Sequence, residues 1–388
     1  MKISKPQISR NVDHTLYSVD VESKEGSGPL WYEVPNSFGD FLSANCDAAL
    51  VALLIPAMAN GEDIQVDGAI SEELYFKISG PLQHVLQLVI PSLQKVEVFP
   101  QSLCAGDADQ AKGVATGFSG GIDSYCLLAD HLFSEIPDSF KITHLLFNNV
   151  GSHGKGGERL FRERYDRLVP AAERLGLPFL KVNSNLDSFY SKKLNFQQTH
   201  TMRNFSVPLV LQNGIGRYLY ASAYSYSDVF VGPSKDLAYT DSIVLPLLST
   251  EWVDGLSVGS EHTRVAKTLR VAELSDSYQA LDVCVSSRSA SSYTNCGSCW
   301  KCLRTLATLD IAGYLDRYSE AFDLNAYKAH KSEYFRTLRG SEDPLLIEVV
   351  RLADELGYPL PGSGLGESSL VSSRTKGFYR RMAEKLKG

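Results

Sequence analysis

Short apolar segments alternate with longer amphipathic segments from about residue 111 of the 388-residue chain onward. The apolar segments predict β-strands, and the longer segments between them predict α-helices. The predicted strands cover residues 113–118, 142–150, 179–184 and 228–233, and the predicted helices cover 124–133, 158–176 and 208–224. Strands that alternate with helices of this length form βαβ units, so we expect an α/β fold in which helices cover both faces of a parallel sheet.

Three polar segments follow predicted strands of this sheet. They cover residues 117–126, 148–157 and 232–242. In open parallel sheets, ligands bind in the crevice at the carboxyl ends of the strands. The sequence therefore predicts a ligand site at this edge of the sheet.

The turn after the first of these strands combines glycines with hydroxyl and carboxylate side chains. Gly120 and Gly121 let the backbone approach a ligand and expose its N–H groups. The N-terminus of the following helix favours an anion, and Ser119 and Ser124 add hydroxyl donors. Asp123 supplies a carboxylate that can hold Mg²⁺ against phosphate oxygens. The turn therefore predicts a phosphate-binding site.

The turn lacks the lysine and spacing of a Walker loop, and it lacks the glycine spacing of a dinucleotide-binding turn. Instead, "FSGGIDS" at 118–124 resembles the SGGxDS signature of the PP-loop ATP pyrophosphatases. These enzymes cleave ATP to AMP and pyrophosphate, and many adenylate a carbonyl-type oxygen. The resemblance implies a PP-loop fold that binds ATP and Mg²⁺ through Phe118 and the turn, with Phe147 beside the adenine. A serine-glycine turn without a function is the alternative.

Four of the seven cysteines lie close together late in the chain. Cys296, Cys299 and Cys302 form the pattern "CGSCWKC", and eleven residues separate Cys284 from Cys296. Four thiolates at this spacing suit tetrahedral Zn²⁺, and a closed set of four cysteines is typical of structural zinc sites. An iron–sulfur cluster is the alternative. The pattern and the odd number of cysteines favour a metal site in a reducing cytoplasm over a disulfide framework.

The glycine turn and the cysteine pattern together resemble the QueC family, the 7-cyano-7-deazaguanine synthases. The zinc knuckle of that family has the form C-G-x-C-x-x-C, which "CGSCWKC" matches. Weaker similarities over residues 112–310 imply an arginine-asparagine pair at Arg203 and Asn204 and a substrate-side lysine at Lys267. The resemblance implies that Asp123, Arg203 and Lys267 assist the adenylation of a 7-carboxy-7-deazaguanine-type carboxylate, with the two cations neutralising phosphate charge.

The chain departs from this family in several places. About 110 residues precede the glycine turn, a long extension follows the cysteines, and the segments at 148–157 and 234–242 match the family only loosely. Longer proteins of this shape resemble QueC-like members of anti-phage defence operons such as the Qat system. In those proteins we expect a protein amine to receive the deazapurine, whereas ammonia leads towards the nitrile. We therefore expect the family resemblance to predict the use of ATP better than it predicts the acceptor.

Three segments are expected along the chain. Residues 1–110 form an N-terminal α+β module, 111–310 form the PP-loop domain with the zinc knuckle, and 311–388 form a helical extension. In the first module, the predicted strands cover 30–35, 63–70, 74–79 and 95–100, and the predicted helices cover 47–58 and 81–93. Residues 303–360 are predicted to be helical, and 374–388 form a basic amphipathic tail. We expect this tail to be a solvated helix, and the alternative is that the tail or the N-terminal module docks a protein substrate.

The formal net charge of −7 and the isoelectric point near 5.7 argue against a chain that coats nucleic acid. The longest apolar run, residues 48–59, contains Pro56 and is too short to span a bilayer, so it predicts a core helix. The N-terminal residues lack the apolar segment of a signal peptide. We therefore expect a cytoplasmic enzyme without a membrane or nucleic-acid partner.

Three other functions stay open at this point. A tRNA-modifying PP-loop thiolase would need a sulfur-handling cysteine and a basic face. An ammonia ligase similar to GMP synthetase would leave the cysteine pattern unexplained. A nucleotide or nucleobase sensor that has lost catalysis would keep the glycine turn but would need no acceptor.

Overall fold

The computed structural model describes residues 1–106, 110–153, 157–190, 194–285 and 293–361 of the chain. The chain divides into two compact units. Unit 1 comprises residues 1–118 and 131–260, and unit 2 comprises residues 119–130 together with those from 261 onward. The glycine turn and the cysteine pattern thus belong to the same unit. The predicted basic tail lies outside the described residues, and the three predicted segments stay a prediction.

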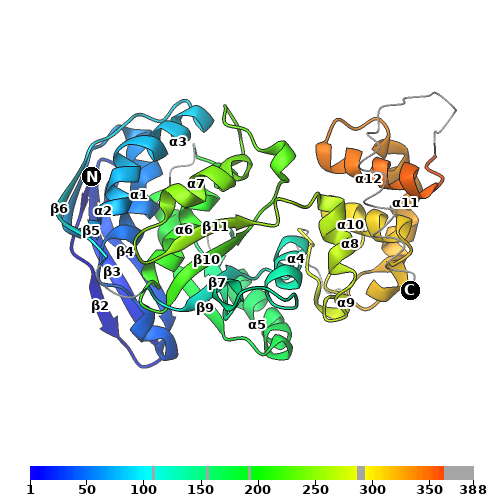
Figure 1. The fold of residues 1–388 in the computed structure, drawn as a ribbon, viewed down its shortest axis with the longest axis horizontal. Helices are drawn as coiled ribbons and strands as arrows, with labels where there is room; N and C mark the ends of the chain where they lie inside the picture. Colours follow the sequence, from blue (N-terminus) through cyan, green and yellow to red (C-terminus); the bar gives the residue numbers. More distant parts are fainter. Residues whose placement is uncertain (107–109, 154–156, 191–193, 286–292, 362–388) are drawn as a thin grey trace. The chain divides into compact units, whose positions relative to one another are not determined.

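Unit 1 is built on one mixed sheet of eleven strands (Figure 1). The strands are β1 (Lys2–Ile3), β2 (Gln7–Arg10), β3 (His14–Ser23), β4 (Gly26–Pro35), β5 (Ile64–Ser71), β6 (Val98–Cys104), β7 (Gly113–Gly117), β8 (His144–Asn149), β9 (Phe179–Ser184), β10 (Ile215–Ala221) and β11 (Asp254–Val258). Their order is β11-β10-β7-β8-β9-β4-β3-β1-β5-β6, and β2 pairs with β3 outside this path. The strands from β11 to β9 are parallel, which confirms the predicted α/β class.

The N-terminal strands continue the sheet of the βαβ region. β4 pairs antiparallel with β9, so that Tyr32 lies opposite Ser184 and Glu33 lies opposite Asn183. The Ser184 hydroxyl donates a hydrogen bond to the backbone carbonyl of Trp31 at 2.6 Å, which reinforces the junction. The N-terminal region and the βαβ region therefore share one sheet.

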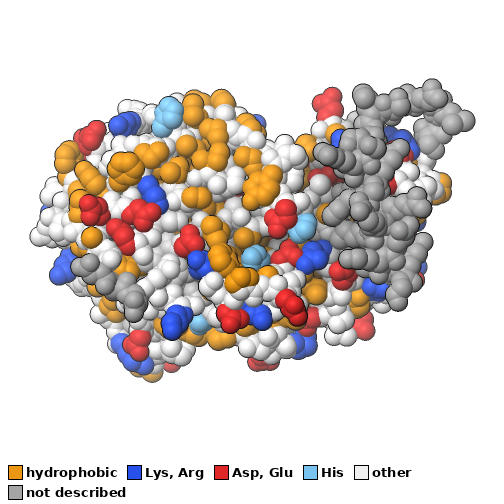
Figure 2. Space-filling view, viewed as in Figure 1, with side chains coloured by type: hydrophobic (Ala, Val, Ile, Leu, Met, Phe, Trp, Pro, Cys, Tyr) orange, Lys and Arg blue, Asp and Glu red, His pale blue; other side chains and the backbone are white. Residues whose placement is uncertain are grey.

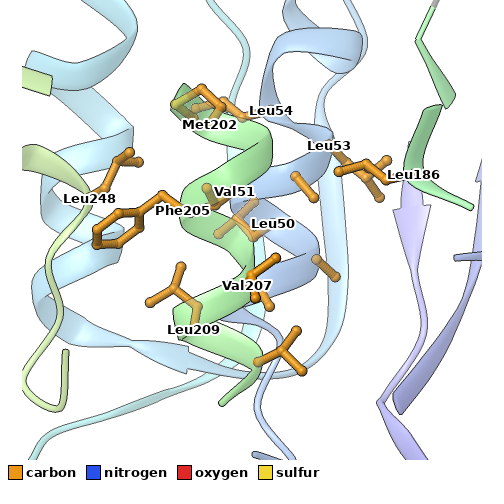
Figure 3. Packing of buried hydrophobic residues seen from close by; sticks show 14 of the residues in the cluster. Leu50, Val51, Leu53, Leu54, Leu186, Met202, Phe205, Val207, Leu209 and Leu248 are labelled. Carbon is orange, nitrogen blue, oxygen red and sulfur yellow. The ribbon is translucent and has the colours of Figure 1, made fainter. Parts of the chain in front are cut away.

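Helices lie against this sheet (Figure 1). They are α1 (Asp47–Asn60), α2 (Glu72–Lys77), α3 (Gln83–Val89), α5 (Glu158–Leu175), α6 (His200–Val210) and α7 (Asp241–Leu248), and a π-helical turn, Ile78–Leu82, connects α2 to α3. Leu50 and Val51 of α1 pack beside Met202 and Phe205 of α6 (Figure 3). Nearly all of α1 is buried, as expected of a helix that is apolar all round, so the predicted core helix is confirmed. In the described part of the chain, no helix has the length and apolar character needed to cross a membrane.

The strand predicted at 74–79 is wrong, because this segment lies in a helix. The Ser71 hydroxyl caps α2 by accepting a hydrogen bond from the Leu74 amide at 2.9 Å. Acidic residues in the first turn and an ion pair between Lys77 and Glu73 favour the helix further. Local capping thus outweighs the β-propensity of the aromatic residues in the segment.

The helix predicted at 208–224 is also wrong. α6 ends at Val210, and β10 follows after a short turn. The turn contains Gly214, where a Cβ would lie 2.3 Å from the ring of Phe41, so the close approach of this ring requires a glycine. The strand predicted at 228–233 is wrong as well, since β11 occupies the position beside β10.

Unit 2 is helical in its described part. Its helices are most of α4 (Ile122–His131), α8 (Arg264–Val271), α9 (Ser277–Ala280), α10 (Trp300–Ile311), α11 (Leu324–Leu338) and α12 (Pro344–Leu356). Buried apolar side chains of α8, α10, α11 and α12 form a common core, which includes Val265, Leu269, Ala307, Ile311, Phe335, Leu338, Val349, Leu352 and Ala353. The helical prediction for 303–360 is therefore confirmed.

The surface of unit 1 mixes both signs of charge. Figure 2 shows Lys and Arg side chains interspersed with Asp and Glu on one face, with hydrophobic side chains gathered near α3. The large exposed hydrophobic side chains of this unit include Phe76, Leu88, Phe99 and Leu103. Phe76 lies in α2 and Leu88 in α3, whereas Phe99 and Leu103 lie in β6, the edge strand of the sheet.

Candidate functional site

The glycine turn follows β7 in the chain and leads into α4. Gly120 has a backbone φ of +72°, which residues with a Cβ rarely adopt. Its carbonyl accepts a hydrogen bond from the Asp282 amide at 2.7 Å. The Gly121 carbonyl accepts a hydrogen bond from the Ser124 hydroxyl at 3.0 Å. Ser119 is exposed, whereas Ser124 is buried. The backbone of the turn is thus fixed by its own hydrogen bonds, and Ser119 is the predicted donor that faces solvent.

Asp123 lies in the first turn of α4 and contacts two cations from α8. Its Oδ1 is 2.8 Å from Nη1 of Arg264 and 3.3 Å from Nζ of Lys267, whose side chain is almost fully buried. Burial raises the pKa of the Asp123 carboxyl, but the charges of Arg264 and Lys267 outweigh burial and hold the pKa below its ordinary value. Two predicted catalytic residues, Asp123 and Lys267, are therefore in contact, and the carboxylate is ionised at neutral pH.

Two further cations from α10 act on the same carboxylate. Lys301 and Arg304 both interact electrostatically with Asp123 and with Arg264. Burial lowers the pKa of both cations, and the charge of Arg264 lowers each of them further. Arg304 is 7% exposed, and its Nε has no hydrogen-bond partner within the described residues. Four cations therefore act on the carboxylate of Asp123, and Asp343 acts on Arg304 as well.

The sequence patterns do not single out Arg264, Lys301 and Arg304 as site residues. A usable signal was present, since Arg264 and Lys267 are three positions apart, and so are Lys301 and Arg304. Residues with this spacing share one face of a helix. The spacing alone predicts two pairs of cations, but only the fold shows that both pairs act on Asp123.

Arg203 belongs to unit 1, where several contacts hold its guanidinium. Its Nε donates to Oγ1 of Thr199 at 2.9 Å, and its Nη1 donates to Asp187 at 2.7 Å and to the Val150 carbonyl at 3.2 Å. The guanidinium carbon lies 3.6 Å from the ring centroid of Tyr190. The Arg203 side chain is therefore part of the buried structure of unit 1, and its role at phosphate stays a prediction.

Phe118 and Phe147, the aromatic residues predicted to contact the nucleotide, lie in an aromatic cluster of unit 1. Phe147 stacks on Phe161 with ring centroids 5.3 Å apart, and Phe118 meets Phe179 edge-on at 5.9 Å. The His153 ring is 5.7 Å from Phe147, and burial followed by the charge of a nearby arginine lowers the pKa of His153 to about 4. The cluster is therefore uncharged at neutral pH, and its contact with a nucleotide stays a prediction.

The four predicted cysteine ligands come together in unit 2. All are free thiols, and their sulfur atoms lie within 4.8 Å of one another. The Sγ atoms of Cys284 and Cys299 are 3.9 Å apart, and those of Cys296 and Cys302 are 4.0 Å apart. Sulfur atoms bonded to a tetrahedral zinc at about 2.3 Å would be separated by about 3.8 Å. This four-cysteine knuckle could therefore hold a metal such as zinc.

Asn295 and Gly297 shape the knuckle. The fully buried Asn295 accepts hydrogen bonds from the amides of Val283 and Cys284 at 2.8 and 3.1 Å, which ties the two parts of the ligand set together. Gly297 has a φ of +70°, and a Cβ there would lie 2.1 Å from the Asp323 carbonyl. The knuckle therefore requires a glycine between its second and third cysteines.

A second group of residue types that bind metals lies between α4 and α8. It comprises Cys126, Asp130 and His262. Asp130 Oδ2 is 3.3 Å from Nε2 of His262, and Oδ1 accepts a hydrogen bond from Arg270. Burial and the adjacent Asp130 charge raise the pKa of the Cys126 thiol to about 12, so the thiol is protonated at neutral pH. The group therefore belongs to a hydrogen-bonded network that joins the two helices.

A cavity of about 410 Å³ lies at the carboxyl ends of β8 and β9 in unit 1. Trp31, Asn149, Asn183 and Asp187 contribute to its lining. The Asn149 amide donates a hydrogen bond to Oδ1 of Asn183 at 2.7 Å. This is the sheet edge at which the sequence predicts a ligand site.

Protein-family models, curated proteins and solved structures yield no match to this chain. What the protein does must therefore be inferred from its own residues. The features with the clearest chemistry are the cation cluster at Asp123 and the four-cysteine knuckle.

Proposed function

We propose that the protein is an ATP-dependent adenylating enzyme that resembles the QueC family. ATP and Mg²⁺ bind at the glycine turn, and the acceptor is a carboxylate of the 7-carboxy-7-deazaguanine type. Ammonia or a protein amine then replaces AMP. The knuckle holds Zn²⁺ as a structural ion.

One observation carries this proposal, namely the gathering of four cations at the glycine turn. Arg264, Lys267, Lys301 and Arg304 all act on the carboxylate of Asp123. Several partly buried cations at one place favour a polyanionic ligand. The adjacent glycines leave room for such a ligand beside the backbone. These features support a triphosphate or pyrophosphate group as the ligand in this proposal.

The first chemical step forms an acyl adenylate. An oxygen of the acceptor carboxylate attacks the α-phosphorus of ATP, and the bond from the α-phosphorus to the bridging oxygen breaks. Pyrophosphate leaves with the bonding electrons, and Arg264 and Lys267 neutralise the charge that develops on it. Asp123 supplies the carboxylate oxygens that Mg²⁺ prefers.

The second step forms an amide. The amine nitrogen attacks the acyl carbon, and AMP leaves with the electrons of the carbon–oxygen bond. The amine nitrogen then loses a proton. A cysteine nucleophile is not required, in agreement with the raised pKa of Cys126.

The test measures pyrophosphate released from ATP–Mg²⁺ with 7-carboxy-7-deazaguanine and ammonium. We expect carboxylate-dependent release, and we expect Lys267→Met to reduce it about 100-fold or more, because a buried charge beside the leaving group is lost. Lys328→Met, at an exposed position of α11, serves as the matched control and should leave the rate unchanged. Tight ATP binding without pyrophosphate release would instead favour a nucleotide sensor.

A further inference from the structure

We propose that Lys301 and Arg304 form an anion subsite that belongs to the four-cysteine knuckle and depends on the metal held there. The ligand class is a phosphate-type oxyanion, and inorganic pyrophosphate is the probe. The inference rests on the proposed function for the identity of the anion in the reaction. The evidence for the subsite and its test concern binding alone.

The first evidence is the buried guanidinium of Arg304. This side chain is 7% exposed, and its Nε has no hydrogen-bond partner in the described part of the chain. Because an arginine stays protonated in proteins, its burial without a bonded anion is costly. The position of Arg304 therefore predicts an anionic ligand.

The second evidence is that other donors lie beside Arg304. The ring centroid of Trp300 lies 5.4 Å from Nζ of Lys301 and 5.3 Å from Cζ of Arg304, so both cations are next to the same side chain. The hydroxyl of Tyr334 is buried without a hydrogen-bond partner in the described residues, and it interacts electrostatically with Arg304. Two unpartnered buried donors and a neighbouring ammonium group match the needs of an oxyanion.

The dependence on metal follows from where the two cations lie in α10. Cys299 is the N-cap of α10, and Cys302 lies in its first turn. Lys301 is between these two ligands, and Arg304 follows Cys302 by two positions. A metal bonded to Cys299 and Cys302 fixes this helix end to the two other cysteines. Metal binding therefore sets the positions of both cations.

The experiment titrates inorganic pyrophosphate into the full chain with its metal bound and follows the heat released. Lys301→Met and Arg304→Met should each raise the Kd about 10-fold or more, because each removes a charged donor. Arg304→Lys should recover part of the affinity. Lys328→Met is the control for a loss of charge at an exposed position of the same unit, and its Kd should change less than about twofold. Unchanged affinity in both Lys301→Met and Arg304→Met overturns the subsite.

A second arm tests the metal. Cys299→Ser, or removal of the metal by a chelator, should weaken pyrophosphate binding although both cations are still present. Circular dichroism reports whether the helices survive. A folded metal-free protein that binds pyrophosphate with unchanged affinity contradicts the metal dependence. If the metal-free protein unfolds, the metal-bound variants of Lys301 and Arg304 still decide the subsite.

The two proposals can fail separately. Absence of adenylation, with pyrophosphate binding that depends on Arg304, contradicts the proposed function and supports the subsite. Carboxylate-dependent pyrophosphate release that is unaffected in Lys301→Met and Arg304→Met, with unchanged pyrophosphate affinity, supports the proposed function and overturns the subsite.

Discussion

The carboxylate of Asp123 and the guanidinium of Arg264 form an ion pair, with 2.8 Å between Oδ1 and Nη1. The pair joins the first turn of α4, beside the glycine turn, to the first turn of α8. Lys301 and Arg304 also interact with both members of the pair. Asp123 is therefore the carboxylate shared by these cations, and its charge should affect both stability and ligand binding.

Asp123 is expected to stabilise the fold in a pH-dependent way. Its pKa is lower in the folded chain than in the unfolded chain, because Arg264 and Lys267 outweigh the effect of burial. Its contribution is therefore fully present above the ordinary aspartate pKa of about 4 and is lost as the pH falls through the folded-state pKa. We expect Asp123→Asn to lower the free energy of unfolding at neutral pH and to have a smaller effect below about pH 4.

Urea unfolding of both proteins at a series of pH values provides the measurement. The difference between them should be constant above about pH 5 and should narrow as the solution becomes more acidic. If the difference in unfolding free energy keeps the same size throughout the acidic range, the charge of Asp123 does not contribute to stability.

Gly120 is expected to be required for the turn itself. Its φ of +72° is costly for a residue with a Cβ, so Gly120→Ala should lower the free energy of unfolding by about 1–2 kcal/mol. The matched control is Gly340→Ala, where a Cβ would meet nothing within 4 Å and φ is not in the left-handed region. This control should stay within about 0.5 kcal/mol of the parent protein. If urea unfolding shows the same loss of unfolding free energy at both positions, the positive φ at Gly120 does not require a glycine.

The knuckle is expected to bind one metal ion per chain. Elemental analysis of the purified protein should find zinc, and Cys299→Ser should reduce its content because one of the four sulfur ligands is lost. Cys104→Ser is the control, since that half-buried thiol lies in unit 1 and is not one of the four. Iron together with inorganic sulfide would instead identify an iron–sulfur cluster.

Arg203 is expected to contribute to stability as well as to any role at phosphate. Its guanidinium is bound to Asp187 and stacked on Tyr190 in the interior of unit 1. Arg203→Met should therefore lower the free energy of unfolding by about 3 kcal/mol, because it removes a buried charge and leaves its partners unpaired. Chemical unfolding checks this value. A variant with parental stability but impaired adenylation would assign Arg203 to chemistry alone.

Much of the local structure could be predicted from the sequence. The strand at 179–184 has the predicted bounds, and α5 and α1 differ from their predicted ranges only at their ends. Alternating apolar segments and helical periodicity are local signals, so they need no knowledge of distant partners. The four cysteine ligands can be predicted for the same reason, because their spacing along the sequence is itself the signal.

The remaining features depend on contacts that are distant in sequence. The local sequence predicts a helix over the residues of β10, because the pairing of β10 with β7 and β11 cannot be seen locally. The pairing of β4 with β9 brings together residues about 150 positions apart, and no local sequence pattern predicts it. Arg264, Lys301 and Arg304 were missed because a cation on a helix has the same local sequence whether it faces water or a carboxylate.

The most direct test of the central claim is exchange of labelled pyrophosphate into ATP. The reaction contains ATP–Mg²⁺ and 7-carboxy-7-deazaguanine but no amine, so that only the first, reversible step can occur. We predict exchange that requires the carboxylate, persists in Lys328→Met and is lost in Lys267→Met. ATP bound by the parent protein without any carboxylate-dependent exchange would contradict adenylation of this acceptor.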